Sequence, residues 1–232
     1  MRNVLDWHVR IADLGRRLLW LQLLWVAHTL LGAVVLGIAP ATAAVHAVLR
    51  RDHMAGEGWP GTAERERLPR EFHRAWRREL VPANAVGLPL VAGWAFVLLD
   101  HRLLGTTEVA GAGALQVLLW VVTLVLMCMS ATVWVLQAHF AEGPLRVLRR
   151  AAVLVVARPL ISLGGAAVLA ATACLYYVVP GLAVVLGIMA PAWVTTALVW
   201  RSGILPRPAD TSDGEPTAAS DGAPTPALAP SR

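Results

Sequence analysis

Lysine is absent from this chain of 232 residues, so all twenty of its basic side chains are arginines. Charged residues make up only 15% of the chain and hydrophobic residues make up 57%, whereas a soluble domain typically carries about 25% charged residues. The mean hydropathy is +0.60. This balance excludes an ordinary water-soluble domain, and the lysine-free, arginine-rich usage is typical of a GC-rich bacterial genome.

Motifs for catalysis and cofactor binding are also missing. The sequence has no HExxH zinc helix, no GxSxG nucleophile turn and no phosphate-binding P-loop. Its two cysteines, Cys128 and Cys174, both lie inside apolar runs, where thiols behave as small hydrophobic side chains. Met127 and Met129 flank Cys128, but consecutive helical residues point about 100° apart and cannot converge on one ion. We therefore expect no metal, no cofactor and no enzymatic activity.

Long runs without charge are what the sequence does contain. The run 18–39 is long enough, at about 1.5 Å per residue, to cross the ~30 Å hydrocarbon core of a bilayer. Further runs are separated by charged groups, by Pro82 and by Pro180-Gly181. The predicted spans are residues 18–39, 83–99, 115–136, 160–179 and 182–200. The expected fold is all-α, a polytopic transmembrane helical bundle of about five spans in one integral membrane domain, residues 1–202.

Three other segments have the pattern of amphipathic helices. Apolar and charged residues alternate at helical spacing over residues 2–17, 68–80 and 145–156. We expect these helices to lie in the headgroup layer with their arginines reaching water, and Phe72 and Trp76 of the second to face the membrane. Residues 203–232 are rich in proline and poor in large apolar side chains, and are expected to form a disordered cytoplasmic tail.

The distribution of arginine predicts the orientation of the spans. Eight arginines lie between the first two spans and four between the third and fourth, whereas Arg102 is alone in the loop after the second span. The positive-inside rule makes the arginine-rich loops cytoplasmic, in a bacterial plasma membrane, with the N-terminus outside and the C-terminus inside. Four arginines near the N-terminus argue against this placement, and a first segment that re-enters would satisfy both counts.

His28 is the first candidate for a functional side chain, because it lies at the middle of the first predicted span. An ionisable group at that depth is costly and marks a proton relay or a ligand contact by default. The alternative is a neutral ring that hydrogen-bonds to another helix, for instance to Thr123 or Ser130. The last three spans contain no acidic or basic residue within their cores, which weakens any ion-coupled mechanism.

The basic segment 65–78 is the second candidate, with Arg74, Arg77 and Arg78 at its end. Anionic lipid headgroups are the expected partner, at about 1 kcal/mol per basic residue near the membrane surface. A nucleic acid is not expected, because the acidic residues Glu66, Glu71 and Glu79 interrupt the positive charge.

Several of these segments together resemble the YesL-like family of bacterial membrane proteins, a domain of unknown function. The resemblance rests on Leu23-Leu24-Trp25, on residues 37–50, on Phe72 and Trp76, and on Ala83-Asn84-Ala85-Val86-Gly87. It implies a polytopic plasma-membrane protein of roughly five spans, often encoded near carbohydrate transport systems. It implies no catalytic or binding residues. Ala138-His139-Phe140 departs from the family, where Ala-Arg-Phe is expected.

Pro40 and Thr42 lie within this resemblance and have a physical role of their own. We expect Pro40 to end the helix of the first span at the water boundary, and the Thr42 hydroxyl to bond a carbonyl that the proline frees. A short helix along the cytoplasmic face would follow.

Two classes of function remain open. The first is a non-enzymatic accessory or regulatory component, acting through its basic cytoplasmic segments beside a membrane transport complex, such as one for sugar uptake. The second is a small-solute carrier or channel. In that case His28, Gln22, Gln116 and Gln137 would line one water-accessible path.

Overall fold

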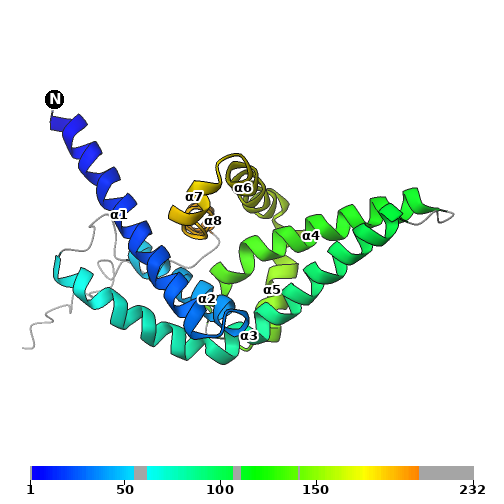
Figure 1. Ribbon diagram of the computed structural model, residues 1–232, viewed down its shortest axis with the longest axis horizontal. Coiled ribbons are helices and arrows are strands. Elements are labelled where there is room, and N and C mark those ends of the chain that lie inside the picture. Colours follow the sequence, from blue (N-terminus) through cyan, green and yellow to red (C-terminus); the bar gives the residue numbers. More distant parts are fainter. Residues whose placement is uncertain (1, 55–61, 107–110, 141, 204–232) are drawn as a thin grey trace, which may run out of the picture.

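The computed structural model describes residues 2–54, 62–106, 111–140 and 142–203, and these residues form helices joined by short turns (Figure 1). No strand occurs in these ranges. The helices are α1 (Arg2–Leu31), α2 (Val35–Met54), α3 (Thr62–Thr106), α4 (Ala112–His139), α5 (Pro144–Ala157), α6 (Pro159–Val178), α7 (Pro180–Val185) and α8 (Met189–Arg201). The all-α fold class is therefore confirmed. Of the predicted tail 203–232, residues 204–232 lie outside the described residues.

Within the described parts of the chain, three helices are long and apolar enough to cross a membrane: Arg67–Thr106 of α3, Ala112–His139 of α4 and Pro159–Val178 of α6. They contain the predicted spans 83–99 and 115–136, and all of the predicted span 160–179 except Val179. Large apolar side chains remain exposed along them, for example Phe96, Trp120 and Leu160. Such exposure is expected where lipid covers the surface, because hydrocarbon surroundings do not drive apolar side chains inward.

The predicted span 18–39 is wrong as a single helix. α1 ends at Leu31, the chain turns through Gly32, Ala33 and Val34, and α2 begins at Val35. Ala33 and Val34 have φ of 53° and 64°, in the left-handed region that ends helices. Hydropathy alone does not reveal this turn, because every residue in it is apolar or glycine.

The predicted span 182–200 is also broken. α7 ends at Val185 and α8 starts at Met189, with Gly187 at φ 39° between them. The buried amide of Gln22 from α1 lies so close to Gly187 that a Cβ there would overlap it. Gly187 therefore lets α1 approach the chain reversal between α7 and α8.

α3 joins two elements that were predicted separately. The amphipathic segment 68–80 and the span 83–99 form one continuous helix of 45 residues, although Pro69, Pro82 and Pro89 lie inside it. Pro82 therefore does not open a new helix. A proline within a helix removes one hydrogen bond and bends the axis, and α3 is visibly bent midway along its length (Figure 1).

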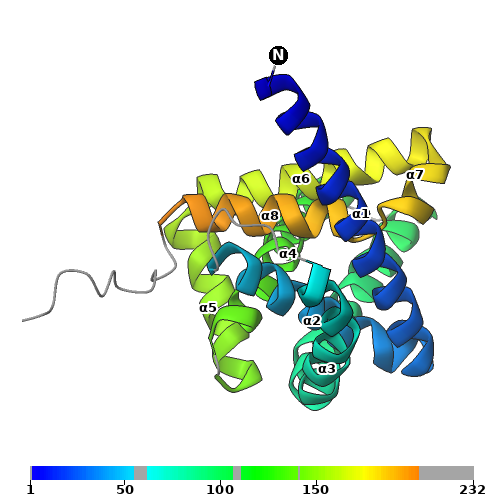
Figure 2. The ribbon, with the colours of Figure 1, turned by 90° about the vertical axis from the view of Figure 1, so that its left-hand side faces the viewer.

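Phe72 and Trp76 face the protein core, not the membrane as predicted. Phe72 is fully buried and Trp76 is 7% exposed, and they pack with Leu21 of α1, Val45 of α2 and Met189 of α8. The first half of α3 is thus fixed between α1, α2 and α8, whose arrangement Figure 2 shows from the side. A fully buried aromatic side chain of this kind contributes several kcal/mol, since its truncation typically costs about 3 to 5 kcal/mol.

The segment 145–156 forms most of α5 and buries part of its apolar surface against protein. α5 buries Val147, Ala151 and Leu154 against α3 and α4, while Leu145 and Val156 remain exposed. α5 is therefore apolar on both its protein face and an outward face.

Candidate functional site

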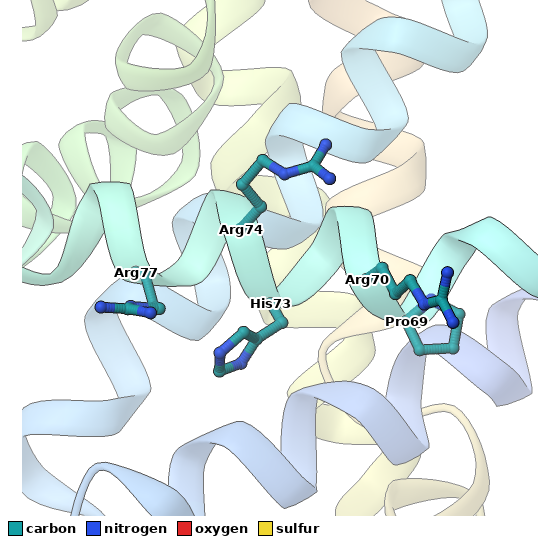
Figure 3. Close-up of a pocket in the computed structure, with 5 residues that line it drawn as sticks. All are labelled: Pro69, Arg70, His73, Arg74 and Arg77. Atoms are coloured by element: carbon teal, nitrogen blue, oxygen red, sulfur yellow. The ribbon is translucent and has the colours of Figure 1, made fainter.

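A hollow lined by basic residues lies on the first half of α3. Pro69, Arg70, His73, Arg74 and Arg77, all on α3, line an open space of about 620 Å³ (Figure 3). Arg70, Arg74 and Arg77 are spaced four and three residues apart, so their side chains leave the same face of the helix. We call these residues the basic hollow.

The fold explains why this face of α3 is turned outward. Leu68, Phe72 and Trp76 are spaced four residues apart, and all three are buried in the cluster formed with α1, α2 and α8. Burying this stripe leaves the arginines of the same turns exposed on the other side of the helix. The basic hollow is therefore displayed by a rigid helix and not by a loop.

Glu71 and Glu79 of α3 do not neutralise the basic hollow. Glu71 binds Arg51 of α2, and Glu79 accepts hydrogen bonds from Gln137 of α4 at 3.0 Å and from Arg78 at 3.4 Å. Among the described residues, the arginines of the hollow have no acidic partner, so they are available to an external anion. Glu71 and Glu79 are thus engaged elsewhere, and the side chain of Glu66, the third acidic residue noted from the sequence, lies outside the described side chains.

The predicted set Arg74, Arg77 and Arg78 is only partly brought together. Arg74 and Arg77 line the basic hollow, whereas Arg78 does not and instead pairs with Glu79, with its side chain 76% exposed. Arg70 and His73 are members that the sequence analysis missed. Their helical spacing from Arg74 and Arg77 is the signal that could have found them.

His28 lies next to the basic hollow, not at the centre of a membrane span. Its Nδ1 is 2.8 Å from the Leu24 carbonyl and its Nε2 is 3.2 Å from Nδ1 of His73. Because the carbonyl can only accept, Nδ1 of His28 donates, and in the neutral ring Nε2 accepts from His73. The predicted partners Thr123 and Ser130 are wrong: they lie near His101 and Trp94 respectively.

Pro40 lies inside α2 and does not end a span, contrary to the prediction. The Thr42 hydroxyl donates to the Ile38 carbonyl at 2.8 Å and accepts from Nε1 of Trp25 on α1 at 3.2 Å. The carbonyl that Pro40 deprives of a helical donor is that of Leu36, and it accepts from the Asn84 amide at 3.0 Å. Thr42 thus joins α1 to α2, and Asn84 joins α3 to α2.

The polar residues proposed for a carrier path do not meet. His28 bonds to Leu24 and His73, Gln116 to His101 and Gln137 to Glu79. Gln22 lies against Gly187. The described residues therefore place these four side chains in separate contacts.

Comparison with known proteins gives a family match without an activity. Residues 18–101 match the family model described as "Protein of unknown function, DUF624". The chain is similar to the "Uncharacterized protein YesV" of Bacillus subtilis (strain 168), with 36% identity over 76 residues. That alignment covers 33% of this chain and 33% of the relative. No solved structure matches. The match covers α2, most of α3 and the part of α1 from Leu18, so it includes the basic hollow.

Proposed function

We propose that this protein is a non-enzymatic accessory or regulatory component of the bacterial plasma membrane that holds anionic lipid headgroups at the basic hollow. The observation that carries the proposal is the outward, unneutralised set Arg70, Arg74 and Arg77 on a helix whose other face is buried. Arginine suits a phosphate because its planar guanidinium offers paired donors.

The position of the basic hollow along α3 supports a lipid as the anion. Arg77 precedes by only a few residues the uncharged run 80–99, which lies within the candidate span Arg67–Thr106. At about 1.5 Å per residue, Arg77 and Arg74 lie within ~10 Å of the start of that run. This is the depth at which lipid phosphates meet a membrane-crossing helix.

Lipid retention in nanodiscs tests the lipid proposal directly. The full chain, reconstituted in nanodiscs containing a trace of spin-labelled phosphatidylglycerol, should retain this lipid against a neutral background. Changing Arg70, Arg74 and Arg77 together to Gln should weaken the retention about a hundredfold, since three arginines contribute roughly 3 kcal/mol. Matched control substitutions remove the same charge elsewhere: Arg78, Arg146 and Arg149 to Gln should change it by less than tenfold. Equal losses in the two variants would contradict a localised headgroup site.

The accessory role is tested by recovery of partners from native membranes. We propose that the protein works beside a carbohydrate uptake system, as the resemblance to the YesL-like family implies. Purification in mild detergent should then recover subunits of a transport complex with the natural chain. Changing Arg70, Arg74 and Arg77 together to Gln should lose them, and this variant keeps the buried Phe72 and Trp76 of the same segment. A chain that purifies alone and passes a solute when reconstituted would support the carrier instead.

A further inference from the structure

The segment 18–51 forms a helical hairpin whose two ends lie together. Arg17 of α1 donates two hydrogen bonds to the Asp52 carboxylate of α2, at 2.9 Å from Nε and 2.7 Å from Nη2. Further along, Trp25 contacts Thr42, and Gly37 lies against Thr29. The chain therefore leaves this pair along α1 and returns to it along α2.

The tip of this hairpin is apolar and exposed. Six large side chains at the ends of the two helices and in the turn are 41–67% exposed: Leu30, Leu31, Val34, Val35, Leu36 and Ile38. No acidic or basic residue other than His28 and His46 occurs between Arg17 and Arg50. Water is an unfavourable environment for such a continuous apolar patch.

The backbone polar groups of the turn form hydrogen bonds within the protein and do not need water. The amides of Gly32, Ala33 and Val34 donate to carbonyls of α1 at 2.9–3.1 Å. The amides of Val35, Gly37 and Ile38 donate to carbonyls within the turn at 2.8–3.1 Å. The Leu36 carbonyl, which Pro40 leaves open, accepts from Asn84. Irregular backbone is tolerated in a membrane only where its polar groups are satisfied in this way.

The tip is continuous with the surface that enters the membrane. Leu36 contacts α3 at Asn84, and the Ala39 side chain lies 2.7 Å from where a Cβ on Gly87 would be. Both α3 residues belong to the uncharged run 80–99, several residues inside its start. The hairpin tip and the apolar part of α3 thus begin at the same level.

The hairpin is too short to cross. From Arg17 to its end at Leu31, α1 rises about 21 Å, less than the ~30 Å hydrocarbon core. We propose that residues 18–51 enter the membrane from the cytoplasmic side and leave it on that side, with the tip at residues 30–38 embedded in the near leaflet. This reverses the outside position of the N-terminus that five full crossings would require.

Contacts at the base of the hairpin support one common side. Arg50 donates to the Ala138 carbonyl at the end of α4, at 3.2 Å. The His53 and His139 rings lie 6.0 Å and 6.1 Å from the Trp200 ring at the end of α8. With α1 entering at this end, the four N-terminal arginines join the other basic groups, and Arg102 alone lies across the membrane. The positive-inside rule is then satisfied without the conflict noted from the sequence.

Cysteine labelling in intact cells tests the topology. In a chain with Cys128 and Cys174 changed to Ala, a single cysteine is placed by Gly15→Cys, Met54→Cys or Gly105→Cys. No side chain lies within 4 Å of a Cβ at Gly15 or Gly105, and Met54 is 39% exposed, so each site accepts the change. A membrane-impermeant maleimide should label only the Gly105→Cys chain in intact cells, and all three after permeabilisation. Labelling of Gly15→Cys in intact cells would overturn the proposal.

The depth of the tip is tested separately. A bimane fluorophore on Val35→Cys should be quenched by nitroxide lipids labelled in the acyl chain and protected from iodide in water. The same fluorophore on Met54→Cys should show the opposite preference. Strong quenching by iodide at residue 35 would place the tip in water and overturn the embedded hairpin, whatever the labelling at residue 15.

Discussion

The side-chain amide of Asn84 donates a hydrogen bond to the Leu36 carbonyl, 48 residues away in the sequence, at 3.0 Å. It donates a second bond to Leu80, one turn back on its own helix, at 2.7 Å. Leu36 is four residues before Pro40, so its carbonyl has no helical N–H to accept. Asn84 therefore replaces a backbone donor that the proline removes, and at the same time joins α3 to α2.

Replacing Asn84 by Leu should destabilise the protein by about 1 to 2 kcal/mol, because the Leu36 carbonyl then lacks a donor in an apolar region. Thermal unfolding in detergent, followed by loss of monodisperse protein, measures the change. Pro40→Ala supplies the matched background, since it restores the backbone N–H. In that background Asn84→Leu should cost less than half as much. Equal costs in both backgrounds would show that Asn84 acts through another contact.

Close packing between α4 and α6 depends on Gly165. A Cβ at Gly165 would lie 2.9 Å from the Ala131 Cβ, whereas at the neighbouring Gly164 it would meet only the flexible end of Leu198, at 3.3 Å. Gly165→Ala should therefore cost roughly 1 to 3 kcal/mol through overpacking. Gly164→Ala should be neutral or slightly stabilising, because alanine favours the helix. The same unfolding measurement compares them, and similar results for both would contradict a close approach at Gly165.

His46 should make stability depend on pH. Its ring is buried in α2, Nδ1 lies 2.9 Å from the Thr42 carbonyl, and burial lowers the pKa of His46 from 6.5 to about 4. The unfolded chain binds the proton more readily, so the stability due to the neutral ring is complete above pH 6.5 and is lost as the pH falls towards 4. The full loss is on the order of 3 kcal/mol.

The control for this pH dependence is His46→Gln, which cannot titrate. Between pH 7 and pH 4.5 the natural chain should lose more stability than the variant, even though other groups titrate in both. Parallel losses would show that His46 does not enter the fold as a buried neutral ring.

Sequence patterns predicted the fold best where charge and length decide the structure. The runs 115–136 and 160–179 became α4 and α6 with small changes of boundary, because uncharged helices bounded by polar groups have one plausible assignment. The breaks at 32–34 and 186–188 lie within apolar runs. Hydropathy does not distinguish these turns from the helices around them. The turns depend on the close contact of Gly37 with Thr29 across the hairpin and of Gly187 with Gln22, which is distant in the sequence.

The sequence predicted that the candidate site is basic, but it did not predict which residues form it. The arginines of 65–78 indicated a basic surface, yet which of them act together depends on the face that α3 buries. Phe72 and Trp76 have the pattern of a membrane-facing stripe, and only the packing of α1, α2 and α8 shows that they face protein. Likewise, the contact of His28 with His73 joins residues 45 positions apart, a pairing that no local spacing encodes.

His28 separates the two classes of function most directly. In a carrier it would have to contribute to a solvated path, so His28→Leu should abolish solute flux. In the accessory protein that we propose, His28 only orients His73 at the edge of the basic hollow, at 3.2 Å. His28→Leu should then cost about 0.6 to 1 kcal/mol of stability, the range of one hydrogen bond between helices.

Headgroup retention should change by less than threefold in this variant, because the arginines of the hollow are intact, and partners should still co-purify. Reconstituted vesicles measure the solute flux and the headgroup retention. A solute flux that requires His28 would replace the accessory role with the carrier.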